Sequence, residues 1–142
     1  MSEIEIYEHP NIDFTNFVFA FSGWSDANGT ATKAVQFLIE KTNAKRFASI
    51  DPEEFYDFSL VRPNMNFDQS GKRILEWANN DFYYATEESV KGLVFFLGVE
   101  PNLKWKTFCS LISGFCVDLK IKMMISLGAL LDSVPHTRPI KI

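Results

Sequence analysis

The chain has 142 residues, of which 46% are hydrophobic and 23% charged, a composition that fits one globular domain with its own core. Its formal net charge is −4 and its lysines and arginines are scattered, whereas nucleic-acid binding requires clustered cations. Because no apolar run approaches the roughly 20 residues of a membrane span and no signal peptide is present, we expect a cytoplasmic protein that binds neither membrane nor nucleic acid.

The first third of the chain predicts strands on either side of a helix. Residues 4–7 alternate in the manner of a short strand, and residues 17–21 form a continuous apolar run typical of a strand covered on both faces. From about residue 27 to residue 42, apolar side chains recur at helical spacing, which predicts a helix with one buried face. Residues 46–50 predict a further strand.

The middle of the chain begins with the acidic segment Asp-Pro-Glu-Glu-Phe-Tyr-Asp-Phe at residues 51–58. An aspartate cap followed by proline and acids is typical of a helix start, and we favour this over a cluster of carboxylates for proton transfer. Residues 61–77 contain proline, asparagine and glycine, with a short alternating piece at 73–77. This pattern predicts an antiparallel hairpin.

The last third predicts a strand at residues 93–97, a helix at about 103–119 with Asn102 as its N-cap, and a buried strand at 121–127. The succession of strands and helices predicts an α/β fold, a three-layer α/β/α domain with a mainly parallel sheet. Because a parallel sheet needs a crossover and another strand after residue 127, we expect residues 1–142 to form a single domain that is incomplete at its C-terminal end.

The cysteines and histidines predict neither a disulfide nor a metal site. Cys109 and Cys116 are seven residues apart on one predicted helix, a separation of about 10.5 Å, whereas a disulfide allows roughly 7 Å. We therefore expect two buried thiols. His9 and His136 lack a ligand partner at short spacing.

The loop from Gly23 to Gly29 leads from a strand into a helix and has two interpretations. Its backbone amides could bind an anion, although its glycine spacing matches neither a Walker motif nor the dinucleotide fingerprint. Alternatively, Asp26 or Ser25 caps the helix and Gly29 allows close helix packing, which is the interpretation that we favour. Trp24, like the other tryptophans, is expected to be a core or interface anchor.

Two later loops also concentrate polar residues. Lys104 and Lys106 fall in the first turn of a predicted helix, where the macrodipole disfavours cations, so Glu100, another subunit or a bound anion is a candidate partner; a pair of solvated lysines is the alternative. The segment Pro-His-Thr-Arg-Pro contains His136, suited to acid–base work, and Arg138, suited to binding an anion. Without a nucleophile or a metal set beside them, no catalytic residue is predicted.

Five segments, in the same order, resemble the signature segments of the PAC2 family, the proteasome assembly chaperone family. Their sequences are most similar to those of bacterial members of actinobacterial type. The five segments are Phe-Ser-Gly-Trp-Ser-Asp-Ala at 21–27, the acidic segment at 51–58, Val-Arg-Pro at 61–63, Glu-Pro-Asn-Leu-Lys-Trp-Lys-Thr-Phe at 100–108, and Leu-Gly-Ala-Leu-Leu-Asp-Ser-Val-Pro-His-Thr-Arg-Pro at 127–139. The resemblance implies a nucleoside-phosphorylase-like core, homo-oligomers and kinship with chaperones that guide proteasome assembly, but no established reaction. Family domains continue beyond the last segment, and this chain ends Pro-Ile-Lys-Ile, unlike the tails with a penultimate tyrosine of proteasome-binding members.

Two functional hypotheses follow. The first is a non-enzymatic, chaperone-like protein that binds itself, for example as a trimer, and proteasome subunits, without cofactor or metal. The alternative is a protein or enzyme that binds a nucleoside- or phosphate-type small molecule, suggested only by analogy of fold. The candidate interface or pocket residues are Gly23, Trp24, Asp26, Gly29, Glu100, Asn102, Lys104, Trp105, His136, Thr137 and Arg138.

Overall fold

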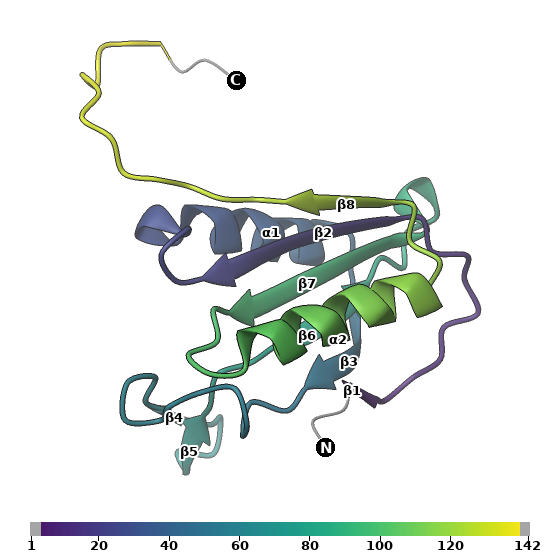
Figure 1. Cartoon of the computed structure of the whole chain (residues 1–142), viewed down its shortest axis with the longest axis horizontal. Coiled ribbons are helices and arrows are strands. Elements are labelled where there is room, and N and C mark those ends of the chain that lie inside the picture. Colours follow the sequence, from purple (N-terminus) through teal and green to yellow (C-terminus); the bar gives the residue numbers. More distant parts are fainter. Residues whose placement is uncertain (1–3, 140–142) are drawn as a thin grey trace.

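The computed structural model describes residues 4–139, so the last residues of the chain's tail lie outside the described part. In that part, a six-stranded sheet carries one helix on each face, and a separate two-stranded hairpin lies beside it (Figure 1). The strands are β1 (Ile4–Ile6), β2 (Asn16–Ser22), β3 (Lys45–Ile50), β4 (Asn64–Phe67), β5 (Arg73–Glu76), β6 (Asp81–Tyr84), β7 (Leu93–Val99) and β8 (Met123–Ser126). The helices are α1 (Thr30–Lys41) and α2 (Trp105–Asp118), with short 3-10 turns at Ala27–Gly29 and Glu88–Val90.

The sheet is mixed, in the order β1-β3-β6-β7-β2-β8. Strand β2 pairs in parallel with β7 and with β8, whereas the β1–β3, β3–β6 and β6–β7 pairs are antiparallel. The prediction of a mainly parallel sheet is therefore wrong. It failed because strand β6, which the sequence analysis missed, returns antiparallel between β3 and β7, a connection that needs no crossover helix.

Strands β2 and β7 are covered on both faces, as their continuous apolar runs predicted. On one face, Phe17 and Phe96 join the core cluster that contains the buried residues of α2. On the other face, Val18 and Phe95 pack with the buried residues of α1. Because successive side chains of a strand point to opposite faces, one phenylalanine-rich run supplies both halves of the core.

The hairpin is confirmed, but three local predictions are wrong. Strands β4 and β5 pair antiparallel. Residues 51–58 form turns instead of a helix, because burial of the Phe55 and Tyr56 side chains in the core determines the path of the backbone. Helix α1 begins at Thr30 rather than near residue 27, after a turn in which Asn28 has a φ of 56°. Lys104, with a φ of 50°, takes the N-cap position of α2 that was expected for Asn102.

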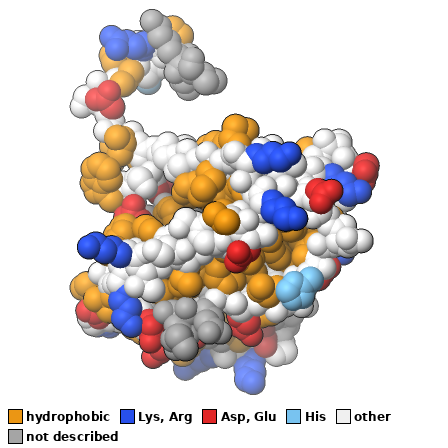
Figure 2. All heavy atoms as spheres, turned by 45° about the vertical axis from the view of Figure 1, so that its right-hand side comes forward, with side chains coloured by type: hydrophobic (Ala, Val, Ile, Leu, Met, Phe, Trp, Pro, Cys, Tyr) orange, Lys and Arg blue, Asp and Glu red, His pale blue; other side chains and the backbone are white. Residues whose placement is uncertain are grey.

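The predicted buried strand at 121–127 is also corrected. Strand β8 is shorter and all four of its residues are exposed, because it lies at the edge of the sheet and pairs only with β2 among the described strands. Leu127 still donates its N–H to the carbonyl of Phe19, and residues 128–139 form an arm that stands away from the body past Ala129 (Figures 1 and 2). Both cysteines are free and lie on α2, where Cys116 is buried and Cys109, contrary to expectation, is exposed.

Candidate functional site

The loops after β2 and β7 leave the sheet in opposite directions. Strand β2 leads into α1 on one face, and its parallel neighbour β7 leads into α2 on the other (Figure 1). In open α/β sheets, such a divergence opens a crevice at the carboxyl ends of the strands, where ligands bind. The candidate residues from Gly23 to Gly29 and from Glu100 to Trp105 follow these two strand ends.

The side chain of Glu100 connects the two loops. Its Oε2 accepts a hydrogen bond from the backbone N–H of Trp24 at 3.0 Å, and its Oε1 accepts from the Ser25 hydroxyl at 3.2 Å. A Cβ atom at Gly23, where φ is 155°, would lie 2.5 Å from Glu100 Oε2. A side chain at residue 23 would therefore strain the backbone and displace the Glu100 carboxylate from its bonds to Trp24 and Ser25.

Asp26 caps helix α1, which confirms the interpretation favoured for this loop. Its buried carboxylate accepts hydrogen bonds from the N–H groups of Ala31 at 2.7 Å and Thr32 at 3.1 Å, and from the Thr32 hydroxyl at 2.5 Å. The role expected of Gly29 is corrected: it adopts a left-handed φ of 67°, and a Cβ there would approach no atom closer than 3.4 Å. Gly29 therefore allows the left-handed backbone conformation at this residue, and it is not needed for close helix packing.

These contacts bear directly on the idea of an anion site. The amides at a helix N-terminus bind anions because they are unpaired and lie at the positive end of the dipole. Here Asp26 already accepts from two amides of α1, and Glu100 accepts from an amide of the preceding loop. The protein's own carboxylates thus hold the positions that a phosphate would need.

The start of α2 is fixed by the acidic segment 51–58. Asn102 donates its N–H to the carbonyl of Phe55 at 2.9 Å and accepts from the N–H of Asp57 at 3.2 Å. The Nζ of Lys104 forms an ion pair with Glu54 at 2.8 Å, so its partner is Glu54 and not Glu100 as considered from the sequence. Since both side chains of this pair are about half exposed, it orients the segment and contributes little to stability.

A buried tyrosine missed by the sequence analysis holds the end of β7. The hydroxyl of Tyr56 lies 2.6 Å from the carbonyl of Val99 and 2.9 Å from Asn80 Oδ1, which also accepts from the N–H of Val99 at 3.2 Å. Burial raises the pKa of Tyr56 to about 12. A tyrosine four residues after Pro52 gives no sequence signal of this role, which depends on contacts with residues 24 and 43 positions away.

The arm is joined to the loop after β2 at one point only among the bonds found in the described residues. Ala129 donates to the carbonyl of Ser25 at 2.7 Å and accepts from the N–H of Ala27 at 3.0 Å. Further along, His136, Thr137 and Arg138 are exposed, and the N–H of Arg138 closes a turn onto Pro135 at 2.9 Å. The structure does not bring these three residues to Glu100 and Asp26.

Exposed apolar side chains follow the carboxyl ends of β2, β7 and β8. We call this surface the loop rim and define it by Trp24, which is 81% exposed, together with Leu103, Trp105, Leu130 and Leu131, which are 47 to 78% exposed. Tryptophan and leucine exposed in this way are typical of surfaces that bind other proteins. Of the candidate residues, Trp24 and Trp105 belong to the rim, and Gly23, Asp26, Gly29, Glu100, Asn102 and Lys104 build the loops beneath it.

The described residues offer neither a metal site nor a membrane-spanning helix. No group of three or more histidine, cysteine, aspartate or glutamate side chains in residues 4–139 is arranged to hold a metal ion. Within the same residues, neither helix is long and apolar enough to cross a lipid bilayer.

Comparison with known proteins identifies relatives of this arrangement. A PAC2 family protein from Streptomyces avermitilis is 34% identical, with a TM-score of 0.77 over 88% of this chain and 54% of that chain. A proteasome-assembly chaperone homologue from Mycobacterium tuberculosis is also 34% identical, with a TM-score of 0.79 over 88% of this chain and 53% of that chain. An archaeal proteasome activator from Pyrococcus furiosus shares the fold at 19% identity, with a TM-score of 0.61 over 88% of this chain and 50% of that chain.

The chain thus spans about half the length of these similar structures. No curated protein sequence matches it. The model of the PAC2 family matches residues 20–142, which include all five signature-like segments and all the candidate residues. Both the family match and the two structures at 34% identity agree with the resemblance read from the loops, and the chain therefore belongs to the PAC2 family.

Proposed function

We propose that this chain supplies the partner-binding surface of a non-enzymatic protein that assists protein assembly, as proteasome assembly chaperones do. The similarity to a proteasome-assembly chaperone homologue supports this proposal. On this proposal, the loop rim contacts a second copy of the chain, for example in a trimer, and also proteasome subunits in the cytoplasm. Residues 1–142 then act as a single three-layer unit with a nucleoside-phosphorylase-like core.

The proposal rests on a contrast within the same loops, between the side that faces the protein and the side that is exposed. Inside, Glu100 and Asp26 accept hydrogen bonds from the amides that an anionic substrate would use. Outside, Trp24 and Trp105 are exposed. Large aromatic side chains held on well-fixed loops can become anchors of a protein interface, because little conformational entropy is lost when they are buried.

The other side chains of the candidate set have supporting roles in this proposal. Gly23, Gly29, Asn102 and Lys104 fix the backbone on which the two tryptophans stand. The exposed arm supplies polar contacts to the partner through His136, Thr137 and Arg138. The guanidinium of Arg138 can form bidentate hydrogen bonds with a carboxylate.

The native mass of the purified chain tests this proposal. We expect size-exclusion chromatography with light scattering to give a monodisperse oligomer at micromolar concentration, and Trp24→Ala or Trp105→Ala to lower its mass while the circular dichroism spectrum is unchanged. Phe37→Ala is the matched control, because Phe37 is an exposed aromatic residue on α1, outside the loop rim. Unchanged mass in both tryptophan variants would show that the rim is not the interface.

The small-molecule alternative is tested by a thermal-shift screen with nucleosides, nucleotides and phosphate. A ligand present at 100 times its dissociation constant stabilises the native state by about 2.7 kcal/mol, which is readily measured. We expect no shift, since the amides of the crevice are occupied. A reproducible shift with any of these compounds would favour the alternative over the chaperone-like function.

A further inference from the structure

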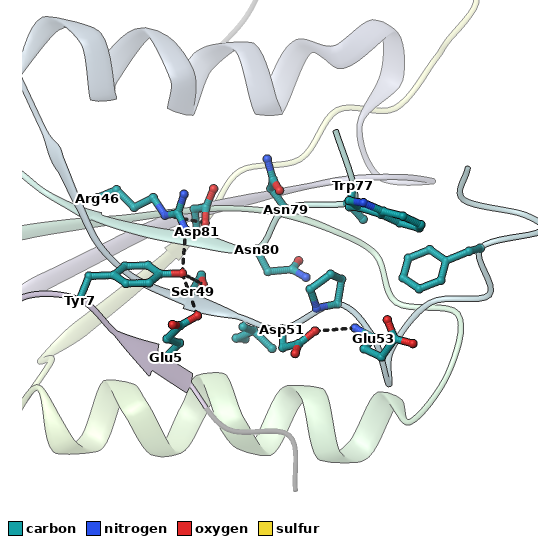
Figure 3. A pocket seen from close by; sticks show the side chains of 14 residues that line it. Glu5, Tyr7, Arg46, Ser49, Asp51, Glu53, Trp77, Asn79, Asn80 and Asp81 are labelled. Carbon is teal, nitrogen blue, oxygen red and sulfur yellow. Dashed lines mark hydrogen bonds and ion pairs between the residues drawn. The ribbon is translucent and has the colours of Figure 1, made fainter. Parts of the chain in front are cut away.

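A second polar site lies in a cavity of about 370 Å³ beside β1 and β3 (Figure 3). It is lined by residues of β1 and β3 and by the two segments that connect β3 to the hairpin and the hairpin to β6. None of its residues belongs to the loop rim, and two of them, Asn79 and Asp81, also line the hollow at the carboxyl ends of β2 and β7.

Asn80 gives the cavity a buried donor without an acceptor. The residue is 1% exposed, and its Oδ1 accepts from Tyr56 and from Val99, yet its Nδ2 has no hydrogen-bond partner. Figure 3 shows the Asn80 amide pointing into the space between the strands and Trp77. Because buried donors are almost always paired in native proteins, this amide group indicates a missing oxygen acceptor.

The walls of the cavity are predominantly acidic. Glu5, Asp51, Glu53 and Asp81 contribute four carboxylates against a single guanidinium, that of Arg46. This guanidinium is already engaged within the protein.

The contacts of Arg46 leave the mouth of the cavity negative. Its Nε pairs with Asp81 at 3.1 Å, its Nη2 donates to the Tyr7 hydroxyl at 2.7 Å, and it lies 4.7 Å from the centre of the Tyr7 ring. Asp51 accepts one backbone bond, from Glu53 at 2.9 Å, which leaves oxygens of both side chains available to a cation.

An aromatic wall completes the site. The rings of Phe58 and Trp77 meet edge to face with their centres 4.8 Å apart, and Trp77 is 45% exposed. Such a wall covers the methylene stem of a long cationic side chain, and the face of an indole attracts the cation itself.

From these observations we propose that the cavity binds a lysine or arginine residue of a polypeptide. The cationic group lies between Asp51 and Glu53, its stem lies on Trp77 and Phe58, and a backbone carbonyl of the same segment accepts from Asn80 Nδ2. A free amine has no such carbonyl, and this is why a polypeptide segment fits better than a small diamine. The site does not depend on the function proposed for the loop rim.

The test is a titration of the isotope-labelled full chain, followed by NMR at the Asn80 side-chain amide and the Trp77 indole. The first probe is N-acetyl-lysine N-methylamide. N-acetyl-norleucine N-methylamide lacks the charge, and n-pentylamine lacks the carbonyl. We expect saturable shifts of both signals with the lysine compound and about tenfold weaker binding of the two other compounds, equivalent to about 1.4 kcal/mol.

Two protein variants locate the cation. Glu53→Gln and Asp51→Asn keep the shape of each side chain and should weaken binding of the lysine compound at least threefold, as should added salt. Glu40→Gln, the same change on the exposed surface of α1, should leave binding unchanged.

Three results would overturn the proposal. The first is the absence of any saturable shift, and the second is equal binding of the norleucine compound. The third is an Asn80 amide signal that shows contact with a trapped water molecule and does not respond to the lysine compound, because water would then be its acceptor.

Discussion

Strands β7 and β8 make an instructive comparison, because both are apolar and both pair in parallel with β2. In β7, Val94, Phe95 and Phe96 are 0% exposed, whereas in β8 Met123, Met124 and Ile125 are 50%, 47% and 37% exposed. Strand β7 has β6 as its second neighbour, and β8 has no second neighbour among the described strands. Apolar composition thus predicts that a segment pairs as a strand, but its burial is decided by what covers it.

The same comparison extends to the chain that follows each strand. After β7, the backbone is held by Glu100, Asn102 and Lys104 through contacts with two other loops. After β8, the arm touches the body at Ala129 and then extends away from it (Figure 1). We interpret the segment after β7 as the rigid support of the rim. We interpret the arm after β8 as a segment that contacts with a partner would stabilise most.

Truncation of one apolar side chain in each strand should produce the largest contrast. Phe96 contacts the rings of Phe17, Phe21 and Phe82, so Phe96→Ala should lower the free energy of unfolding by about 3–5 kcal/mol. Ile125→Ala should cost less than about 1 kcal/mol in the monomer, because its side chain is already partly in water. Urea unfolding of both variants measures the difference, and equal losses would mean that β8 is covered in solution.

Removal of one carboxylate from the loop after β2, and of one from the arm after β8, should give the next largest contrast. Asp26→Ala leaves two amides of α1 without their acceptor and removes the bond from the Thr32 hydroxyl, and should cost about 1–2 kcal/mol. Asp132→Ala on the arm should leave the melting temperature unchanged, since within residues 4–139 its carboxylate accepts only a local bond, from the N–H of Ser133. Similar melting temperatures for the two variants would contradict the capping role of Asp26.

The smallest effect concerns the two cysteines of α2. Cys116 faces the core beside β7 and burial raises its pKa to about 11 from an ordinary value of 9.0, while Cys109 is exposed. Between these two pKa values the unfolded chain loses the thiol proton and the folded chain keeps it, so stability should fall as the pH rises from about 9 to about 11. Stability measured against pH should show a weaker fall in Cys116→Val.

Thiol labelling provides the control for that prediction. In the native protein at pH 8, a disulfide reagent should modify Cys109 rapidly and Cys116 only after addition of denaturant. Rapid modification of both thiols in the native state would show that α2 does not stay packed on the sheet.

The sequence predicted those elements whose signal is local. The phenylalanine-rich runs of β2 and β7 identify strands covered on both faces, and the polar loop after β2 identifies an aspartate cap, because both patterns depend on neighbouring residues. Strand β6 was missed because Asp81–Tyr84 is short and follows two asparagines, which are typical of turns.

The candidate site depended more on contacts that no local pattern reveals. The bond between Glu100 and Trp24 joins residues 76 positions apart, and the pairing of Lys104 with Glu54 spans 50. Likewise, residues 51–58 have the local signature of a helix start, but burial of Phe55 and Tyr56 overrides it. Polar residues in loops could be identified as candidates, while their partners required the fold.

Hydrogen exchange at two protein concentrations tests most directly whether the loop rim is a contact surface. We predict that β7 exchanges slowly at both concentrations, and that the amides around Trp24 and Trp105 become at least tenfold slower at the higher one, about 1.4 kcal/mol of added protection. Exchange of these loops that is independent of protein concentration, but slowed by phosphate or a nucleoside, would contradict the account and favour a ligand site in the crevice.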